Sequence, residues 1–257
     1  MAEFTSYPAG TPSWVDLQTP DVPATVAFYG AVFGWGSEEL GPEAGGYTPL
    51  TKGGKWVAGV GPQMMEGAPV QWLTYVAVDD ITATTESARA AGASILMEPM
   101  DVLDAGKLAV FADPVGGVIA LWQAGRHTGA QLANEPNTFT WSELHTRDTA
   151  TSMAFYGTVF GWTGKTEDFG GMPYTQWMLG DHEVGGMMPM PEMVPAEVGA
   201  YWNTYFAVDS TDAAIDRVRD NGGTVIVPAT DTPVGRLAVV QDPMGAMFSL
   251  IEMTGAS

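Results

Sequence analysis

The stretch Tyr29-Gly-Ala-Val-Phe-Gly-Trp35 decides the fold, because it returns almost unchanged as Tyr156-Gly-Thr-Val-Phe-Gly-Trp162. Two more blocks recur in the same order, beginning at Trp72 and Gly106 in the first copy and at Trp202 and Gly235 in the second. The blocks that begin at Gly106 and Gly235 each end in an Asp-Pro-x-Gly turn, at Gly116 and Gly245. Blocks repeated in one order, at offsets of 127 to 130 residues, indicate one unit written twice in tandem.

Each copy shows the same pattern of predicted elements. A strand at Ser13 to Thr19 alternates with a period of two, and a helix then runs from the N-cap Asp21 to Gly34. A hairpin, the Trp72 strand, a second helix from about Ile81 to Ala91, and two strands joined by the Asp-Pro turn follow. We therefore predict a first βαβββ module at 1–125, a linker at 126–137 and a second βαβββ module at 138–257.

Composition excludes several classes of protein. The chain has 257 residues with no cysteine, 10 basic residues and 30 acidic residues, for a formal net charge of −20. A disulfide framework is therefore excluded, and nucleic acid or an anionic membrane is not an expected partner. The start of the chain lacks the apolar core of a signal peptide, and no apolar run is long enough to cross a membrane. We expect a cytoplasmic protein, either a monomer with intrachain module pairing or a homodimer.

Three features together resemble the vicinal oxygen chelate superfamily, the glyoxalase, bleomycin-resistance and extradiol-dioxygenase group. They are the helix ending in Phe28-Tyr-Gly-Ala-Val-Phe-Gly-Trp35, the strand ending in Val78-Asp79-Asp80, and the Asp-Pro-x-Gly turn. The resemblance implies an α+β fold of tandem βαβββ modules. In such a fold, curved mixed sheets surround a cavity, helices lie outside, and the two modules pair about a pseudo-twofold axis.

The resemblance also implies three metal-ligand positions per module, usually His, Gln or Glu. Counted from the helix-starting Asp and from the Asp-Pro turn, they fall on Trp14, Leu73 and Ala120 in the first copy. In the second copy they fall on Trp141, Asn203 and Ser249. Divalent metals of this class need several imidazole or carboxylate ligands. We therefore expect no metal and no other cofactor.

Alternation along the strands predicts what lines the cavity. Val15 and Leu17 form the more apolar face, which we expect to pack under helices, so the opposite face looks into the cavity. That face carries Trp14, Asp16 and Gln18 in the first copy and Trp141, Glu143 and His145 in the second. By the same argument the cavity face also carries Leu73, Tyr75, Ala120 and Trp122, and Asn203, Tyr205, Ser249 and Ile251.

Aromatic walls with a few converging polar groups are typical of a small-molecule pocket. We predict His145 and Glu143 as catalytic residues, because an imidazole or a pocket carboxylate can serve as a general base. The predicted ligand-binding residues are Trp14, Asp16, Gln18, Tyr75, Trp122, Trp141, Asn203 and Tyr205. The ligand is expected to be an aromatic or apolar metabolite, and the chain could be a binder or an enzyme. The alternatives are a metal-dependent glyoxalase-type lyase or isomerase, and a purely structural module. His127 and His182 are expected to be exposed and inert.

Overall fold

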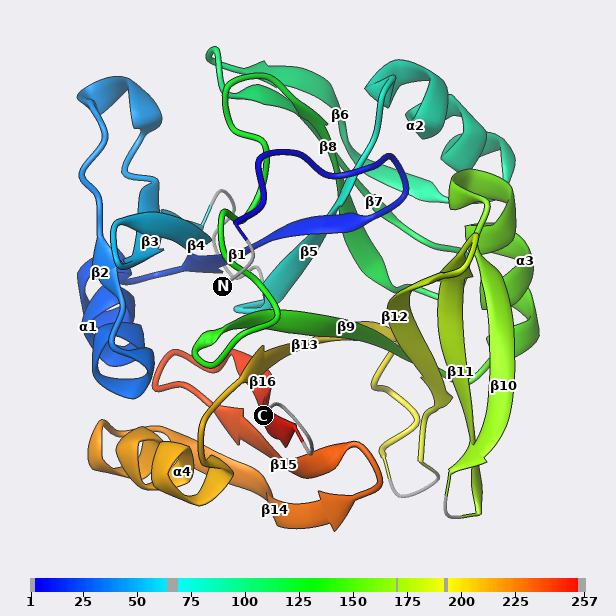
Figure 1. The fold of residues 1–257 in the computed structure, drawn as a ribbon. Coiled ribbons are helices and arrows are strands. Elements are labelled where there is room, and N and C mark those ends of the chain that lie inside the picture. Colours follow the sequence, from blue (N-terminus) through cyan, green and yellow to red (C-terminus); the bar gives the residue numbers. More distant parts are fainter. Residues whose placement is uncertain (1–2, 64–68, 170, 192–193, 254–257) are drawn as a thin grey trace.

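The computed structural model describes residues 3–63, 69–169, 171–191 and 194–253. Each half of the chain forms one eight-stranded sheet (Figure 1). Within the described residues, no helix is long and apolar enough to span a membrane. The first half contains β1 (Pro12–Thr19), α1 (Val22–Phe33), β2 (Gly36–Ser37), the 3-10 turn η1 (Pro42–Ala44), β3 (Thr48–Lys52), β4 (Lys55–Pro62), β5 (Trp72–Ala77), α2 (Ile81–Ala90), β6 (Ser94–Val102), β7 (Gly106–Ala112) and β8 (Val118–Ala124).

The second half repeats this order. It contains β9 (Thr138–Thr146), α3 (Thr149–Phe160), β10 (Thr163–Phe169), β11 (Met172–Leu179), β12 (His182–Pro189), β13 (Tyr201–Ala207), α4 (Thr211–Asp220), β14 (Thr224–Thr232), β15 (Gly235–Gln241) and β16 (Met247–Met253).

Each half contains the βαβββ order twice, so the repeated unit is a pair of such motifs. The first sheet has the order β2-β3-β4-β1-β5-β8-β7-β6, and the second has β10-β11-β12-β9-β13-β16-β15-β14. The two motifs of a half meet at an antiparallel pair, β1 with β5 or β9 with β13. Strand β1 then pairs with β4 in parallel, and β5 pairs with β8 in parallel. The opening strands therefore lie at the centre of each sheet, where their side chains can meet those of both motifs.

The helix ends agree with the sequence prediction. The Asp21 side chain accepts a hydrogen bond from the Ala24 backbone N–H at 3.0 Å, and Asp148 accepts one from Thr151 at 2.9 Å. Both carboxylates satisfy an N–H group that the first turn of a helix leaves free. Gly34 closes α1 in the left-handed conformation, with φ of 73°, which a glycine adopts without a steric penalty.

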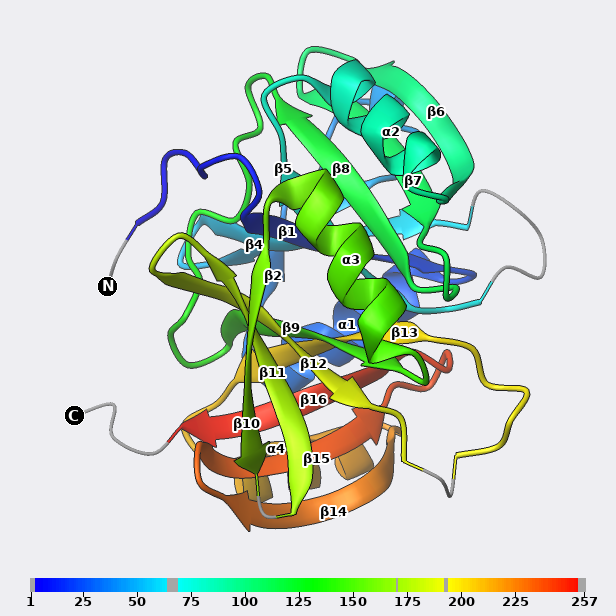
Figure 2. The same ribbon diagram turned by 90° about the vertical axis from the view of Figure 1, so that its right-hand side faces the viewer.

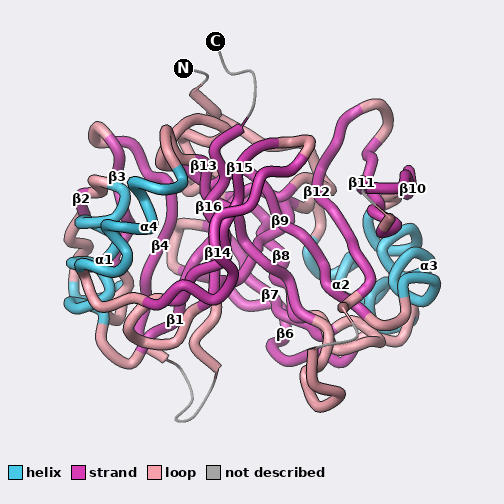
Figure 3. Tube along the Cα trace, turned by 90° about the horizontal axis from the view of Figure 1, so that it is seen from below, coloured by secondary structure: helices cyan, strands magenta, loops and turns pink. Residues whose placement is uncertain are grey.

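Two hydrophobic cores are shared between the halves. In one, α1 residues such as Phe33 pack with Phe206 of β13 and Phe248 of β16. In the other, Phe111 of β7 packs with Phe155 and Phe160 of α3. Helix α1 lies beside α4, and α2 lies beside α3. Figure 3 shows these helix pairs at the two flanks, with the strands between them, and Figure 2 shows α2 and α3 from their own side. Each of these two helix-covered cores therefore needs side chains from both halves.

The repeated motif residues tie the halves together. The Tyr29 hydroxyl accepts a hydrogen bond from Trp72 Nε1 at 3.0 Å and donates to Asp242 of the other half at 3.1 Å. The twin contact runs from Tyr156 to Asp113 at 2.7 Å. The helix motif and the Asp-Pro turn are thus structural, because each copy's tyrosine binds the other copy's turn.

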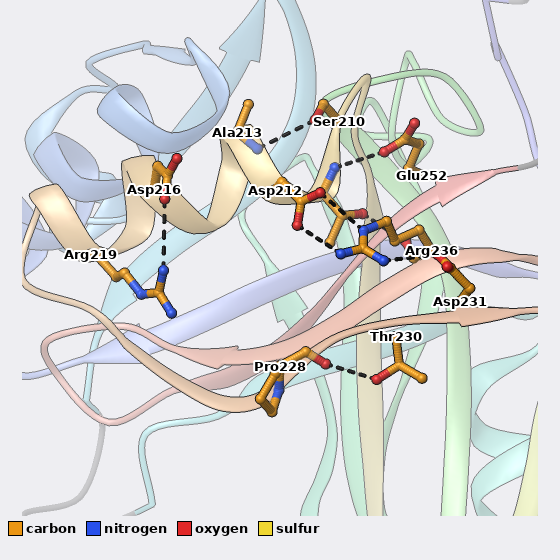
Figure 4. A network of polar contacts seen from close by, with 11 residues as sticks. Ser210, Asp212, Ala213, Asp216, Arg219, Pro228, Thr230, Asp231, Arg236 and Glu252 are labelled. Carbon is orange, nitrogen blue, oxygen red and sulfur yellow. Dashed lines mark hydrogen bonds and ion pairs between the residues drawn. The ribbon is translucent and has the colours of Figure 1, made fainter.

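The sequence did not predict the strands at both edges of each sheet, β2 and β6 in the first and β10 and β14 in the second, which are largely exposed. Figure 4 shows how one of these edges is held. Arg236 of β15 lies between Asp212 at the start of α4, at 3.0 Å, and Asp231 of β14, at 2.9 Å. These ion pairs are mostly in water, so their contribution to stability is small.

Candidate functional site

The face of the second sheet that is turned away from the helix-covered cores, called the concave face below, carries polar residues predicted from the sequence. On β9 it carries Trp141, Glu143 and His145. Their cross-strand partners on β13 are Tyr205, Asn203 and Tyr201, in that order. Cross-strand partners share one face of a sheet, so these six side chains form one surface. The strand residues between them, such as Leu144 and Phe206, lie in the helix-covered cores.

Glu143 is the buried centre of this surface, with 4% of its area exposed. Tyr205 donates a hydrogen bond to Glu143 Oε1 at 2.9 Å, and Tyr174 of β11 donates a second. Trp141 Nε1 in turn donates to the Tyr174 hydroxyl at 2.9 Å. Burial, and then the charge of Glu143, raise the pKa of both tyrosines well above the ordinary value. Both phenols therefore keep their protons and remain donors to the carboxylate.

His145 stands next to this carboxylate. Its Nε2 lies 2.8 Å from Glu143 Oε1, and its ring stacks on Tyr201 with centroids 4.8 Å apart. Within the described part of the chain, neither ring nitrogen has an aligned hydrogen bond, although both are shielded from water. The imidazole thus has a carboxylate at contact distance and a free Nδ1. It could accept a proton from a ligand while Glu143 stabilises the resulting cation.

The floor and rim of the surface differ in chemistry. On the floor, Asn203 Nδ2 donates to Ser249 Oγ at 2.7 Å. The rim carries methionines on the same face: Met188 of β12 pairs with His145, and Met247 and Met253 lie two residues before and four residues after Ser249 on β16. Met247 is 40% exposed and Met253 is 50% exposed. Flexible, polarisable thioethers of this kind adapt to flat apolar ligands.

The first half repeats the same polar network. Trp14 Nε1 donates to the Tyr47 hydroxyl at 2.9 Å, and Tyr75 donates to Asp16 Oδ2 at 2.7 Å. Tyr47 also donates to Asp16. Burial raises the pKa of Asp16 to about 7, because it outweighs the two tyrosine hydrogen bonds, which lower it. Gln18 takes the place of His145 here and is half-buried.

The first concave face is filled by the linker, which corrects one expectation. His127 was expected to be exposed, yet its ring packs in a cage of tryptophans. Ring centroids lie 4.4 Å from Trp14, 5.2 Å from Trp56 and 5.4 Å from Trp122. Burial lowers the pKa of His127 to about 4, so the imidazole is neutral near pH 7. The sequence could not show that a linker residue turns inward. His182 is exposed at the start of β12, as expected.

The predicted site residues therefore form two groups on separate sheets. Trp141, Glu143, His145, Asn203 and Tyr205 lie together in the second half. Trp14, Asp16, Tyr75 and Trp122 lie together in the first.

Sequence reasoning missed Tyr47 and Tyr174. Their shared offset of 127 was the available signal. Each packs against a glycine, Gly59 or Gly186, on the neighbouring strand, where any side chain would collide with the tyrosine hydroxyl.

The residues at the family's metal positions do not fit a metal. An indole N–H is a donor without a free lone pair, and leucine and alanine have no ligand atom. Asn203 and Ser249 are bonded to one another. Across the described ranges, no group of three His, Cys, Asp or Glu side chains is close enough to hold an ion. We therefore derive no chemical step through a metal at these positions.

Comparison with known proteins identifies the family. The model of the Glyoxalase/Bleomycin resistance protein/Dioxygenase superfamily matches residues 11–121 and 138–250, so the chain belongs to this superfamily. "Putative glyoxylase CFP32" of Mycobacterium tuberculosis is 41% identical, over 98% of both chains. "Anthracycline biosynthesis protein DnrV" of Streptomyces peucetius is 36% identical, over 97% of this chain and 96% of that one.

Solved structures share the fold. The Mn(II)-bound glyoxalase from Novosphingobium aromaticivorans matches with a TM-score of 0.64 and 16% identity, over 97% of this chain and 86% of that one. The 2,3-dioxygenase LapB from Pseudomonas sp. KL28 matches with a TM-score of 0.64 and 14% identity, over 94% and 91% of the two chains. At these identities the likeness concerns the fold alone.

Proposed function

We propose that the second half binds a planar, mostly apolar small molecule on its concave face and performs acid–base chemistry on it with His145 and Glu143. The observation that carries this proposal is the contact of 2.8 Å between His145 and a buried carboxylate, beneath a half-exposed rim of aromatic and methionine side chains. An imidazole held by a carboxylate is a suitable general base, because the carboxylate stabilises the protonated ring.

The proposed roles follow from the contacts. Tyr174 and Tyr205 fix the Glu143 carboxylate, and Tyr201 holds the His145 ring by stacking. The ring could then remove a proton from an acidic C–H or O–H group of the ligand, and return it to another atom for an isomerisation. Asn203 and Ser249 lie where they could bind a ligand oxygen if their mutual hydrogen bond opens. A relative named for anthracycline biosynthesis supports a planar polycyclic ligand.

The alternative is a metal-dependent glyoxalase-type reaction. A relative named as a glyoxylase, at 41% identity, favours it, whereas the donor set at the family positions does not. Elemental analysis of protein purified without added metal discriminates between the two. Stoichiometric zinc, nickel, iron or manganese would support the alternative and contradict the metal-free proposal.

Paired variants test the proposal. A library of aromatic natural products is incubated with the protein, and bound compounds are identified by native mass spectrometry. For any compound retained, His145→Ala should weaken binding or turnover by at least about tenfold, the scale expected for a lost general base or polar contact. Gln18→Ala, at the matching position of the first half, should change either quantity by less than about twofold.

His182→Ala removes an exposed histidine and serves as the control. Equal effects of His145→Ala and Gln18→Ala would contradict the assignment of the site to the second half. Retention of no compound at all would contradict small-molecule binding.

A further inference from the structure

We propose that the concave face of the first half is a second binding site, for a planar nitrogen heterocycle, in which the imidazole of His127 occupies the place of the ligand. This inference rests on the proposed function, because its template is the polar network of the second half. The first observation is the shape of the cage. Three indole rings surround the His127 ring, and Trp14 meets it edge-on, at an interplanar angle of 81°. A cage of this kind fits one flat ring.

The second observation is the polar floor beneath the cage. Trp14, Tyr47, Asp16 and Tyr75 reproduce the hydrogen bonds of Trp141, Tyr174, Glu143 and Tyr205. Asp16 is 95% buried, since 5% of its area is exposed. Among the described residues, Asp16 Oδ1 and His127 Nε2 are both shielded from water without a hydrogen-bond partner. Unpaired buried polar atoms are uncommon and costly, so a ligand N–H group that replaces the His127 ring would gain by donating to Asp16 Oδ1.

The third observation is the position of His127 in the chain. His127 belongs to the linker, outside the repeated units, so the second half has no matching residue among its repeats. Two backbone hydrogen bonds hold the linker beside the cage. Ala130 N–H donates to Ser13 O and Gln131 N–H donates to Trp56 O, both at 2.7 Å. The His127 ring is held mainly by packing. A hollow of about 210 Å³ lies on one side of the cage, where Trp122 and Thr128 are among its lining residues.

The side-chain analogue 4-methylimidazole is the probe, used at a pH at which it is neutral. His127→Ala should open the cage and bind one equivalent of probe, measured by tryptophan fluorescence and calorimetry. We expect His127→Ala to bind the probe at least about tenfold more tightly than the wild type does. In the wild type the His127 ring is tethered beside the cage and competes with the probe at a high effective concentration. His127→Phe should bind no better than the wild type, because its ring refills the cage. His182→Ala, which removes an exposed histidine, should match the wild type.

Two results would overturn the inference: no saturable binding to His127→Ala, or equal affinities for His127→Ala and the wild type. Should His127→Ala fail to fold, the ring protons of His127 are followed by NMR in the wild type. They should shift as excess probe displaces the ring, and an unchanged signal would overturn the inference. The double variant His127→Ala/His145→Ala separates the two sites. It should keep probe binding, whereas loss of binding would place the probe at His145. Failure of the proposed function at His145 would leave these outcomes unchanged.

Discussion

Asp16 and Glu143 occupy matching positions, and each accepts hydrogen bonds from two tyrosines. Glu143 also has His145 at contact distance, while one oxygen of Asp16 lies buried without a partner among the described residues. Removing a charge from water without compensation is unfavourable, and this is why the pKa of Asp16 is raised. At the scale of single residues, the two sites therefore differ in the contacts that their buried carboxylates make.

Asp16→Asn should remove one pH-dependent contribution to the stability of the protein. The folded pKa, about 7, lies above the ordinary value of 3.8, so the folded state holds this proton more tightly than the unfolded state. The contribution of Asp16 to the stability of the wild type should therefore fall as pH rises between about 4 and about 7, and then level off. The variant should be more stable than the wild type at pH 8, by on the order of a few kcal/mol, and similar near pH 4.

Urea unfolding from about pH 4 to pH 8 measures this difference. Asp181→Asn, in an exposed turn, controls for the loss of one negative charge from the molecule. If Asp16→Asn and the wild type keep a constant difference in unfolding free energy across this range, Asp16 does not titrate as described.

At the scale of elements, the sites depend on the close approach of neighbouring strands. Gly186 of β12 faces Glu143 of β9 in the parallel pair, and the Tyr174 hydroxyl fills the space where a side chain would stand. Gly59 and Tyr47 repeat this contact in the first half. The glycines are therefore required by packing, since a methyl group would displace the tyrosine that holds the carboxylate.

Gly186→Ala should displace Tyr174 from Glu143 and from Trp141. We expect a loss of stability of about 1–3 kcal/mol from overpacking. For any aromatic ligand found to bind, we expect affinity to fall by about tenfold. Thermal unfolding and calorimetry measure the two effects. Gly199→Ala is the matched control, because no atom lies within 4 Å of the added methyl group and its φ is not in the left-handed region. A ligand affinity unchanged in Gly186→Ala would show that Tyr174 does not position the carboxylate.

The sequence predicted the elements that carry strong local signals. The N-caps Asp21 and Asp148, the helix-ending glycines and the repeat itself all have local causes, and the strand faces follow from simple alternation. What it could not predict depends on long-range contacts. The edge strands β2, β6, β10 and β14 are mostly exposed, and their sequences lack a clear apolar alternation. The inward turn of His127 and the two glycine–tyrosine contacts depend on segments far apart in the chain.

At the scale of the whole molecule, the halves depend on each other. Tyr29 and Phe33 of α1, and Trp35 just after the helix, pack against Phe206 and Phe248 of the second half. Trp35 Nε1 donates to Asn137 O, and Trp162 Nε1 donates to Gly10 O. Separating the halves would expose both shared cores and leave Asp113 and Asp242 without their tyrosine partners. A large exposed apolar surface of this kind drives association.

A fragment of residues 1–125 should therefore be insoluble or dimeric. Dimerisation is a specific expectation, because the second half is a repeat of the first and a second copy of the fragment offers a similar surface in the same place. Light scattering or analytical ultracentrifugation gives the mass of the soluble fraction. Co-expression of residues 1–137 with 138–257 should instead give a soluble one-to-one complex, because both cores are then complete. A folded, monomeric 1–125 fragment would contradict the prediction that each half needs the other. It would show that one half can bury the apolar faces of its own helices.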